Sequence, residues 1–387
     1  MLLGILNSQA AGGGSSYWLA TLGGASNDYG RGIVTDSSGN SYVVGLSSST
    51  GAGGSDSLLV KYESSGAVLW QRSLGQTGAE EGLGVALDSA NNVYIAGLTT
   101  SQGAGSNDVL IAKYNSSGTL QWQRVLGGTG AEFGISIALD SEGNAYILGK
   151  STIGGILYFL LAKYNSSGTL QWQRTLGGSG ADDGEGIAID SSNNIYLVGA
   201  TTSAGAGSRD FLIAKYNSSG TLQWQRILGS VEEEFGRAIT LDNLGNLYLT
   251  GYGFSTGRGN QDILIAKYNS SGTIQWQRRI ASTGNEAGAG LAFHSGTIYV
   301  TGNTNATGEG GYDVLLAKLP SDGSLTGTYV LDGVDMVYSA SSLTAATSTL
   351  TASTSTLTAA TSTLTAATST LTDSTATLTS HFVTIPA

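Results

Sequence analysis

The feature that most constrains this chain is an internal repeat of about 52 residues that runs through most of its length. Six tryptophans mark the copies: Trp18, Trp70, Trp122, Trp172, Trp224 and Trp276. Two further series keep the same period, namely Lys61, Lys113, Lys163, Lys215, Lys267 and Lys318, and Tyr42, Tyr94, Tyr146, Tyr196, Tyr248 and Tyr299. A period near 50 residues is typical of repeat folds whose units bury their apolar faces only against one another. The chain is therefore predicted to fold as a tandem-repeat domain.

One copy, residues 134–174, contains four short segments with the pattern of β-strands. Residues 134–139, 145–149, 160–164 and 169–174 are apolar or alternating, and Gly, Asn or Ser residues bound them. Asp140 and the residues after it have turn chemistry, as does the Asn-Ser-Ser-Gly run between the last two segments. We predict one four-stranded antiparallel sheet in each copy and no helix in the repeated region.

A sheet with two apolar faces must stack on its neighbours, and radial stacking hides the faces and protects the sheet edges. The predicted fold is therefore an all-β, six-bladed β-propeller over residues 17–331, preceded by an N-terminal arm over residues 1–16. The chain has six copies of the first three strands but seven segments that resemble the fourth. We expect the extra segment, residues 18–22, to supply the outer strand of the last blade, and residues 325–330 to lead away to the tail. The alternative, an open solenoid, would leave uncapped ends.

Composition and charge exclude several classes of function. The formal charge is −11, so nucleic acid is not an expected partner, because phosphate binding needs a basic surface. Cysteine is absent, which excludes disulfides and thiolate chemistry. No run approaches the roughly 18 apolar residues of a membrane span. Residues 1–6 are apolar but lack the basic start and the length of a signal peptide, so we do not expect ordinary secretion.

The C-terminal region, residues 332–380, changes to Ser, Thr, Ala and Leu with a period of seven. The repeating positions are Met336, Leu343, Leu350, Leu357, Leu364, Leu371 and Leu378. In a strand an odd period would place successive Leu side chains on opposite faces, so we predict a helical heptad stalk that forms a coiled coil on self-association, as a trimer. Thr and Ser are weak helix formers, so a disordered linker is the alternative. Residues 381–387 are predicted to form a short docking strand.

The turn motif carries a resemblance to a known family. Residues 140–149 read Asp-Ser-Glu-Gly-Asn-Ala-Tyr-Ile-Leu-Gly, a pattern that resembles the bacterial β-propeller repeat family and is similar to NHL-type blades. The resemblance covers residues 17–331 and implies the fold, but it implies no single activity because propellers host many functions. The last copy departs from the pattern, since His294-Ser295-Gly296 replaces the Asp turn.

Acidic residues recur on the rim that carries the links between blades. Five of them lie five residues before the repeated lysine: Asp56, Asp108, Asp210, Asp262 and Asp313. Others lie in the links: Glu80, Glu132, Asp182 and Glu286. Carboxylates among Gly-rich turns suit Ca²⁺, but repetition in every blade favours turn capping and pairing with the repeated Lys and Arg residues. We therefore expect no cofactor, with Ca²⁺ at the five Asp residues as the alternative. The tryptophans are expected to pack between blades, with sugar stacking as the alternative.

The third copy breaks the rule, because its middle loop is two residues shorter and Tyr158 stands in the Asp position. Tyr158 and Phe159 are therefore the candidate ligand contacts. Enzyme chemistry has little support, since the two histidines, His294 and His381, lack metal-ligand spacing and no nucleophile motif is present.

These observations favour a non-enzymatic structural or binding protein. Near-identical repeats, the absence of cysteine and the heptad tail suggest a bacteriophage virion component, such as a tail fibre, spike or decoration protein. Its expected partners are copies of itself, other virion proteins and a host surface glycan. A bacterial extracellular adhesin is the second hypothesis, and a glycan-active propeller hydrolase or lyase is the third.

Overall fold

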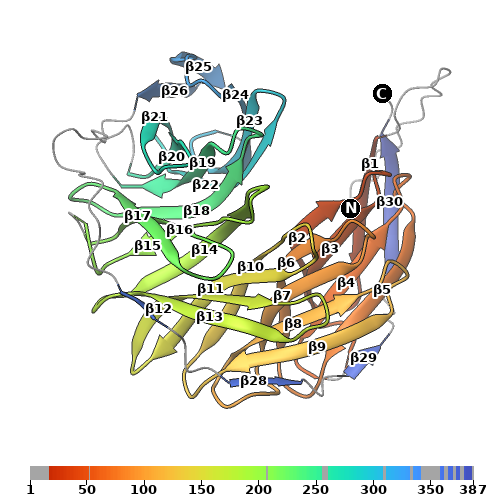
Figure 1. Cartoon of the computed structure of the whole chain (residues 1–387). Coiled ribbons are helices and arrows are strands. Elements are labelled where there is room, and N and C mark those ends of the chain that lie inside the picture. Colours follow the sequence, from red (N-terminus) through yellow and green to blue (C-terminus); the bar gives the residue numbers. More distant parts are fainter. Residues whose placement is uncertain are drawn as a thin grey trace. The chain divides into compact units, whose positions relative to one another are not determined.

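The computed structural model describes residues 17–51, 53–205, 208–254, 260–307, 311–331 and 334–340, and the segments 358–360, 365–368, 372–374 and 379–385. All regular structure in these residues is β-strand, arranged in antiparallel sheets (Figure 1). No helix in this part of the chain is long and apolar enough to cross a membrane. The all-β prediction is confirmed.

The chain divides into two compact units, residues 1–127 with 365–387, and residues 128–364. The first unit holds two sheets of consecutive strands, which we call sheets 1 and 2. Sheet 1 contains β2 (Asp28–Thr35), β3 (Ser41–Ser47), β4 (Asp56–Tyr62) and β5 (Val68–Gly75). Sheet 2 contains β6 (Glu80–Leu87), β7 (Val93–Thr99), β8 (Asp108–Tyr114) and β9 (Leu120–Gly127).

The second unit holds sheets 3 to 6. Sheet 3 contains β10 (Glu132–Leu139), β11 (Ala145–Ile153), β12 (Ile156–Tyr164) and β13 (Leu170–Gly177). Sheet 4 contains β14 (Asp182–Ile189), β15 (Ile195–Thr201), β16 (Asp210–Tyr216) and β17 (Leu222–Leu228). Sheet 5 contains β18 (Glu234–Leu241), β19 (Leu247–Gly253), β20 (Asp262–Tyr268) and β21 (Ile274–Ala281). Sheet 6 contains β22 (Glu286–His294), β23 (Thr297–Thr304) and β24 (Asp313–Pro320).

The first hairpin turn of each of sheets 1 to 5 is closed by its aspartate, as the turn motif predicts. In sheet 3, Oδ1 of Asp140 accepts hydrogen bonds from the amides of Glu142 and Asn144 at 3.1 and 2.9 Å. Its Oδ2 accepts from the Tyr146 hydroxyl at 3.1 Å. Gly143 has a φ of 75°, which glycine adopts without a Cβ penalty. The repeated Asp, Gly and Tyr therefore fix one local structure.

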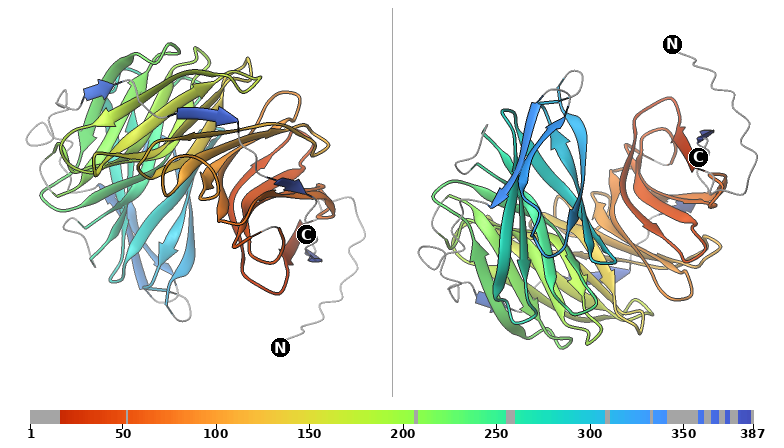
Figure 2. Two further views of the ribbon diagram at one scale, coloured as in Figure 1. Left: turned by 90° about the horizontal axis from the view of Figure 1, so that it is seen from below. Right: turned by 90° about the horizontal axis from the view of Figure 1, so that it is seen from above.

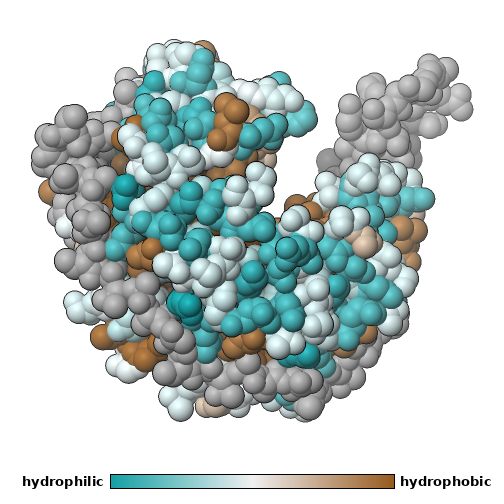
Figure 3. Space-filling model, in the orientation of Figure 1, coloured by the Kyte–Doolittle hydropathy of each residue, from teal (hydrophilic) through white to brown (hydrophobic). Residues whose placement is uncertain are grey.

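Neighbouring sheets within a unit pack through apolar faces. In the second unit Leu148 and Leu161 of sheet 3 join one core cluster with Leu197 and Leu212 of sheet 4. Figure 2 shows the same stacking from two further directions. Because the repeated apolar residues face adjacent sheets, the surface drawn in Figure 3 is mostly hydrophilic, with the hydrophobic side chains in small separate groups.

The tryptophans of the outer strands of sheets 1, 3, 4 and 5 pack against the next sheet. Nε1 of Trp172 donates to the carbonyl of Ser218 at 3.3 Å, and Nε of Arg174 donates to the carbonyl of Gly220 at 2.9 Å. A Cβ on Gly220 would lie 2.9 Å from a ring carbon of Trp172. The same contacts join Trp70 to Gly118, Trp224 to Gly272 and Trp276 to Gly323. Packing between sheets is therefore the role of these tryptophans.

The C-terminal residues that the structure describes form short strands along the outer edges of the sheets. β26 (Val334–Ala340) pairs with β21 and with β25 (Gly327–Leu331). β27 (Thr358–Ala360) pairs with β13, β28 (Thr365–Thr368) with β9, and β29 (Thr372–Ser374) with β5. β30 (Thr379–Ile385) pairs with β1 (Tyr17–Gly23) in a two-stranded sheet. Figure 1 shows β28, β29 and β30 in blue beside the strands that they extend.

The described residues of 332–380 form short β-strands and no helix, and the coiled-coil stalk stays a prediction. Met336 lies in β26 and is 6% exposed. The six leucines of the series, at positions 343, 350, 357, 364, 371 and 378, lie outside the described residues. β27, β28 and β29 have only three or four residues each, so none of them contains two positions that are seven residues apart.

At one end of the repeat a sheet lacks its fourth strand, and at the other end a fourth-strand segment stands without a sheet of its own copy. Sheet 6 has three strands among the described residues, one fewer than sheets 1 to 5 have from their own copies. β1 has the sequence of a fourth strand, but it pairs with β30. Residues 325–330 do lead away from sheet 6, since β25 pairs with β26.

Candidate functional site

The recurring acids lie where each sheet passes to the next, and they are buried. Asp56, Asp108, Asp210 and Asp262 are 1–2% exposed at the start of each third strand, while Asp313 is half-buried. Glu80, Glu132, Asp182, Glu234 and Glu286 are 0% exposed at the start of each first strand. The two series converge: a Cβ on Gly75 would lie 1.8 Å from Oδ1 of Asp56 and 2.8 Å from Oε2 of Glu80. Three buried acid pairs are therefore formed, by Asp56 with Glu80, Asp210 with Glu234, and Asp262 with Glu286.

Two glutamates of this series accept hydrogen bonds from the links between sheets and from the neighbouring strands. Glu132 accepts hydrogen bonds from the Gly128 amide at 2.8 Å and the Ser151 hydroxyl at 3.1 Å. Glu286 accepts from the Ser282 amide at 2.8 Å and the Thr304 hydroxyl at 2.9 Å. No group of three or more His, Asp or Glu side chains in the described chain is arranged to hold a metal ion. The hydrogen bonds of Glu132 and Glu286 fit the capping role.

Burial raises the pKa of four of these recurring acids, Asp108, Asp182, Glu234 and Asp262. Burial raises the pKa of Asp262 to about 7, opposed by Arg279 and helped by Glu286. Within the described atoms neither carboxylate oxygen of Asp262 has a hydrogen-bond partner, and Nη1 of Arg279 lies 3.8 Å from Oδ2. Burial also raises the pKa of Glu234 to about 7, against hydrogen bonds from Ser230. At neutral pH the ionised forms of Asp262 and Glu234 are therefore unfavourable in the folded protein.

The repeated lysines and arginines have other partners than the sequence suggested. Nζ of Lys113 lies 3.6 Å from the turn residue Asp88, and Nζ of Lys163 lies 3.8 Å from Asp140. Asp108 and Lys113 lie near opposite ends of β8, and an extended chain rises about 3.3 Å per residue, so the two cannot meet. The arginines do act between sheets, but Arg174 and its equivalents bind turn carbonyls instead of carboxylates.

Tyr158 and Phe159 occupy different environments. Phe159 is 1% exposed and belongs to the core between sheets 3 and 4, so it is not available to an external ligand. Tyr158 is half-buried, and a Cβ on Gly177 would meet its ring at 2.6 Å and Asp182 at 2.5 Å. Its ring thus fills the space that the Asp side chain takes in other sheets. The shorter loop is a two-residue turn in which Gly154 and Gly155 have φ of 60° and 84°.

The sheets differ most on their first strands. The second residue of these strands is Tyr29, Glu81, Phe133, Asp183, Phe235 or Ala287, and the fourth is Arg31, Leu83, Ile135, Glu185, Arg237 or Ala289. The residues around these positions, by contrast, are nearly constant from copy to copy. These two positions therefore distinguish the copies from one another.

In the second unit these variable positions form a connected group of charges, which we call the inner-strand cluster (Lys150, Asp183, Glu185, Arg209 and Arg237). Nη1 of Arg209 lies 3.0 Å from Oδ2 of Asp183, and Nζ of Lys150 lies 3.8 Å from its Oδ1. Nη1 of Arg237 lies 3.2 Å from Oε2 of Glu185. Burial raises the pKa of Glu185, although Arg237 and Lys150 oppose the change. The cluster has one more cation than anions, in a chain of net charge −11.

Aromatic rings border the inner-strand cluster. Phe235 and Tyr252 are stacked with centroids 4.7 Å apart, and Arg209 lies 4.9 Å from the Phe235 ring. Phe254, 43% exposed, packs edge-on to Tyr252. The cluster and Phe235 line a cavity of about 220 Å³. The sequence analysis did not predict this group, because it considered residues that recur in every copy. The residues of this group differ from copy to copy.

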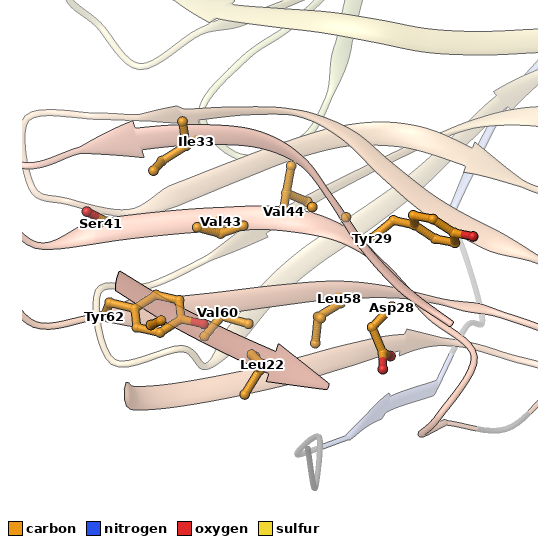
Figure 4. A pocket seen from close by; sticks show the side chains of 13 residues that line it. Leu22, Asp28, Tyr29, Ile33, Ser41, Val43, Val44, Leu58, Val60 and Tyr62 are labelled. Carbon is orange, nitrogen blue, oxygen red and sulfur yellow. The ribbon is translucent and has the colours of Figure 1, made fainter. Parts of the chain in front are cut away.

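A second cavity, of about 290 Å³, lies in the first unit and is mainly apolar. Leu22 of β1 and Val43, Leu58, Val60 and Tyr62 of sheet 1 surround it (Figure 4). Its polar edge is formed by Asp28, whose carboxylate accepts a hydrogen bond from the Ser49 hydroxyl at 2.8 Å.

Comparison with known proteins adds to the fold assignment. Residues 18–51, 121–156 and 171–205 match the family model described as beta-propeller repeat, and residues 91–120 and 191–222 match a beta-propeller domain of unknown function, DUF5122. The chain is 21% identical over 262 residues to an uncharacterized WD repeat-containing protein of Acanthamoeba polyphaga mimivirus, covering 57% of this chain and 17% of that protein. It is 31% identical over 112 residues to the regulatory protein FlaEY of Caulobacter vibrioides, covering 26% of this chain and 12% of that protein.

Two solved structures are among the matches. A protein of unknown function from Dyadobacter fermentans matches with a TM-score of 0.45 and 10% identity, covering 78% of this chain and 97% of that one. YCF48, solved with a D1 peptide, matches with a TM-score of 0.43 and 9% identity, covering 83% of this chain and 94% of that one. The family-model matches and the repeated antiparallel sheets together support a β-propeller fold for the repeated region.

Proposed function

We propose that the six sheets form one closed six-bladed ring in which β1 is the outer strand of sheet 6. The support is that β1 packs on sheet 1 as an outer strand would. Ala20 and Leu22 of β1 contact Leu58, Val60 and Tyr62 of β4. At the same repeat positions, Leu74 of β5 packs in one cluster with Leu110, Ala112 and Tyr114 of β8. In such a ring, the inner strands of sheet 6 would fill the cavity beside β1.

β24 of sheet 6 has an exposed apolar face that this packing would cover. Val314 and Leu316 are 85% and 71% exposed, whereas Phe211 and Ile213, at the same repeat positions in sheet 4, are 0% exposed. Removing apolar side chains of this size from water contributes about 1.5–3 kcal/mol each. An exposed half-interface on sheet 6 and an incomplete one on sheet 1 favour closure within one chain.

We propose that this ring is a non-enzymatic binding protein and that its inner-strand cluster recognises an acidic glycan. The single observation that carries the proposal is the convergence of Arg209 and Arg237 with Phe235 and Tyr252 at positions where the copies differ. Arginine pairs with carboxylates through charge-assisted hydrogen bonds, and an aromatic ring offers a flat face to a sugar. The hydrolase or lyase alternative has less support, because the Glu132-type acids are 0% exposed.

The variant Arg237→Ala tests this function. Removing one charge-assisted contact is expected to weaken binding of a glucuronic acid oligosaccharide by about 10- to 100-fold, since such hydrogen bonds contribute roughly 1.5–3 kcal/mol. The measurement is titration calorimetry, with thermal unfolding recorded to verify that the variant folds. Arg31→Ala is the matched control, because Arg31 holds the same position in sheet 1 and pairs there with Glu81 at 2.5 Å. Equal affinity for a neutral glucose oligosaccharide, or no binding at all, would reject the proposal.

We further propose that the setting of this protein is a bacteriophage particle, as a tail fibre, spike or decoration component, with a bacterial extracellular adhesin as the alternative. The support is the near-identical repeat and the absence of cysteine from a 387-residue chain. Mass spectrometry of purified particles tests the setting: the protein should be present among the particle proteins. Its recovery only from the surface fraction of the producing cell would favour the adhesin.

A further inference from the structure

The three cations of the inner-strand cluster differ in how closely they are paired. Nη1 of Arg209 donates a hydrogen bond to Oδ2 of Asp183 at 3.0 Å, and Nη1 of Arg237 lies 3.2 Å from Oε2 of Glu185. Nζ of Lys150 lies 3.8 Å from Oδ1 of Asp183, which is too long for a hydrogen bond. Each arginine therefore neutralises one carboxylate, and Lys150 is the cation in excess.

The ammonium group of Lys150 is placed to act on a ligand. Its side chain is partly exposed and lines the cavity of about 220 Å³, together with both arginines and Phe235. Nζ also lies 5.4 Å from the centre of the Phe133 ring. An ammonium group has three N–H donors, and among the described residues none of them donates a hydrogen bond from Lys150 to the protein.

The position of Lys150 is one at which the copies differ. Lys150 follows the repeated glycine of the second strand and lies opposite Phe133 of β10. The residues paired in the same way in the other sheets are uncharged: Leu46, Leu98, Ala200, Tyr252 and Asn303. Sheets 1 and 2 fold with leucine at this position, so a lysine there is not a requirement of the sheet.

We propose that Lys150 is the residue that makes the inner-strand cluster select an acidic sugar over a neutral one. The inference rests on the acidic-glycan function proposed above and assigns its specificity to one side chain. A single carboxylate bound beside Nζ makes the cluster neutral, since the other two cations already face carboxylates. A neutral sugar leaves the charge of Lys150 uncompensated in a partly buried cavity, which is unfavourable. The arginines keep further N–H donors with which to orient the ligand.

The variant Lys150→Leu tests this assignment, because leucine is the residue that sheets 1 and 2 have at the same position. Titration calorimetry compares a glucuronic acid oligosaccharide with a glucose oligosaccharide of equal length. We expect the unaltered protein to bind the acidic ligand at least about ten-fold more tightly, and Lys150→Leu to reduce this ratio to about one. Lys150→Arg should keep the preference, since it keeps the charge. Lys150→Gln should lose it as Lys150→Leu does, which provides a polar variant if the apolar one unfolds.

Arg31→Ala is the control for net charge, because it removes one cation outside the cluster and should leave the ratio unchanged. Thermal unfolding verifies that each variant folds. If the unaltered protein shows no preference for the acidic ligand, the proposed function fails and this inference fails with it. If the protein has the preference and folded Lys150→Leu and Lys150→Gln retain it, only the assignment to Lys150 is overturned. Loss of the preference in Lys150→Arg would also contradict a role for the charge.

Discussion

Replacing Gly220 with alanine is expected to destabilise the protein by about 2–5 kcal/mol. Gly220 has a φ of 75°, where a Cβ costs roughly 1–2 kcal/mol. The new methyl group would also lie 2.9 Å from the Trp172 ring, and overpacking of this kind costs about 1–3 kcal/mol. The measurement is urea unfolding followed by tryptophan fluorescence, which also reports the displaced indole.

Gly245→Ala is the matched control for this prediction. Gly245 has a φ of 76°, but the nearest atom to its Cβ position is 3.8 Å away, on Ser270. The control therefore measures the cost of the backbone conformation alone, about 1–2 kcal/mol. If both variants lose the same stability, the contact between turn and tryptophan contributes nothing to the stacking of the sheets, contrary to our account.

Replacing Asp262 with asparagine is expected to stabilise the protein at pH 8 by at least about 1 kcal/mol, since each unit of pKa corresponds to about 1.4 kcal/mol. Asp262 has a pKa near 7 in the folded protein and an ordinary value of 3.8. The folded state therefore holds its proton more tightly, and the contribution of Asp262 to stability falls as pH rises from about 4 to about 7. The variant removes this fall, so its advantage should appear at pH 8 and vanish near pH 4.

Asp190→Asn is the control of opposite sign. Although burial acts against it, hydrogen bonds from Asn194, Tyr196 and the Ser192 amide hold the pKa of Asp190 below its ordinary value. This carboxylate contributes stability above pH 4 and loses it as the pH falls, so its replacement should destabilise the protein at pH 8. Thermal unfolding of both variants from pH 4 to pH 8 makes the comparison. If the stability gained by the Asp262→Asn variant were independent of pH, the inference that Asp262 is a buried carboxylate with a raised pKa would be wrong.

Sequence alone predicted the repeated sheets because their determinants are local and recur in every copy. The Asp140 turn, the Gly143 conformation and the alternation of the strands each depend on residues only a few positions apart. The partners of Lys113 and Arg174 were assigned wrongly because they depend on which end of a strand meets which turn. That relation follows from the register of the folded sheet, which composition does not reveal.

The pairing of the tail strands likewise depends on residues that are remote from them in sequence. A period of seven is compatible with a coiled coil, but it also arises when an extended chain touches a regular array once every seven residues. The choice depends on the outer edges at Gly177, Gly127 and Gly75, which are remote in sequence from the tail strands that pair with them. The inner-strand cluster was predictable in principle, since Arg237 and Glu185 stand out when the copies are aligned with one another.

Closure of the ring is the central claim, and one disulfide tests it directly. If β1 is the outer strand of sheet 6, the register of sheet 1, in which Leu58 lies opposite Ser73, places Leu315 opposite Thr21. The double variant Leu315→Cys with Thr21→Cys should then form an intramolecular disulfide as readily as the observed pair Leu58→Cys with Ser73→Cys. A monomer with that cross-link, identified by non-reducing peptide mapping, is the predicted result. A free-thiol monomer or a disulfide-linked oligomer, with the control pair fully oxidised, would contradict a ring closed within one chain.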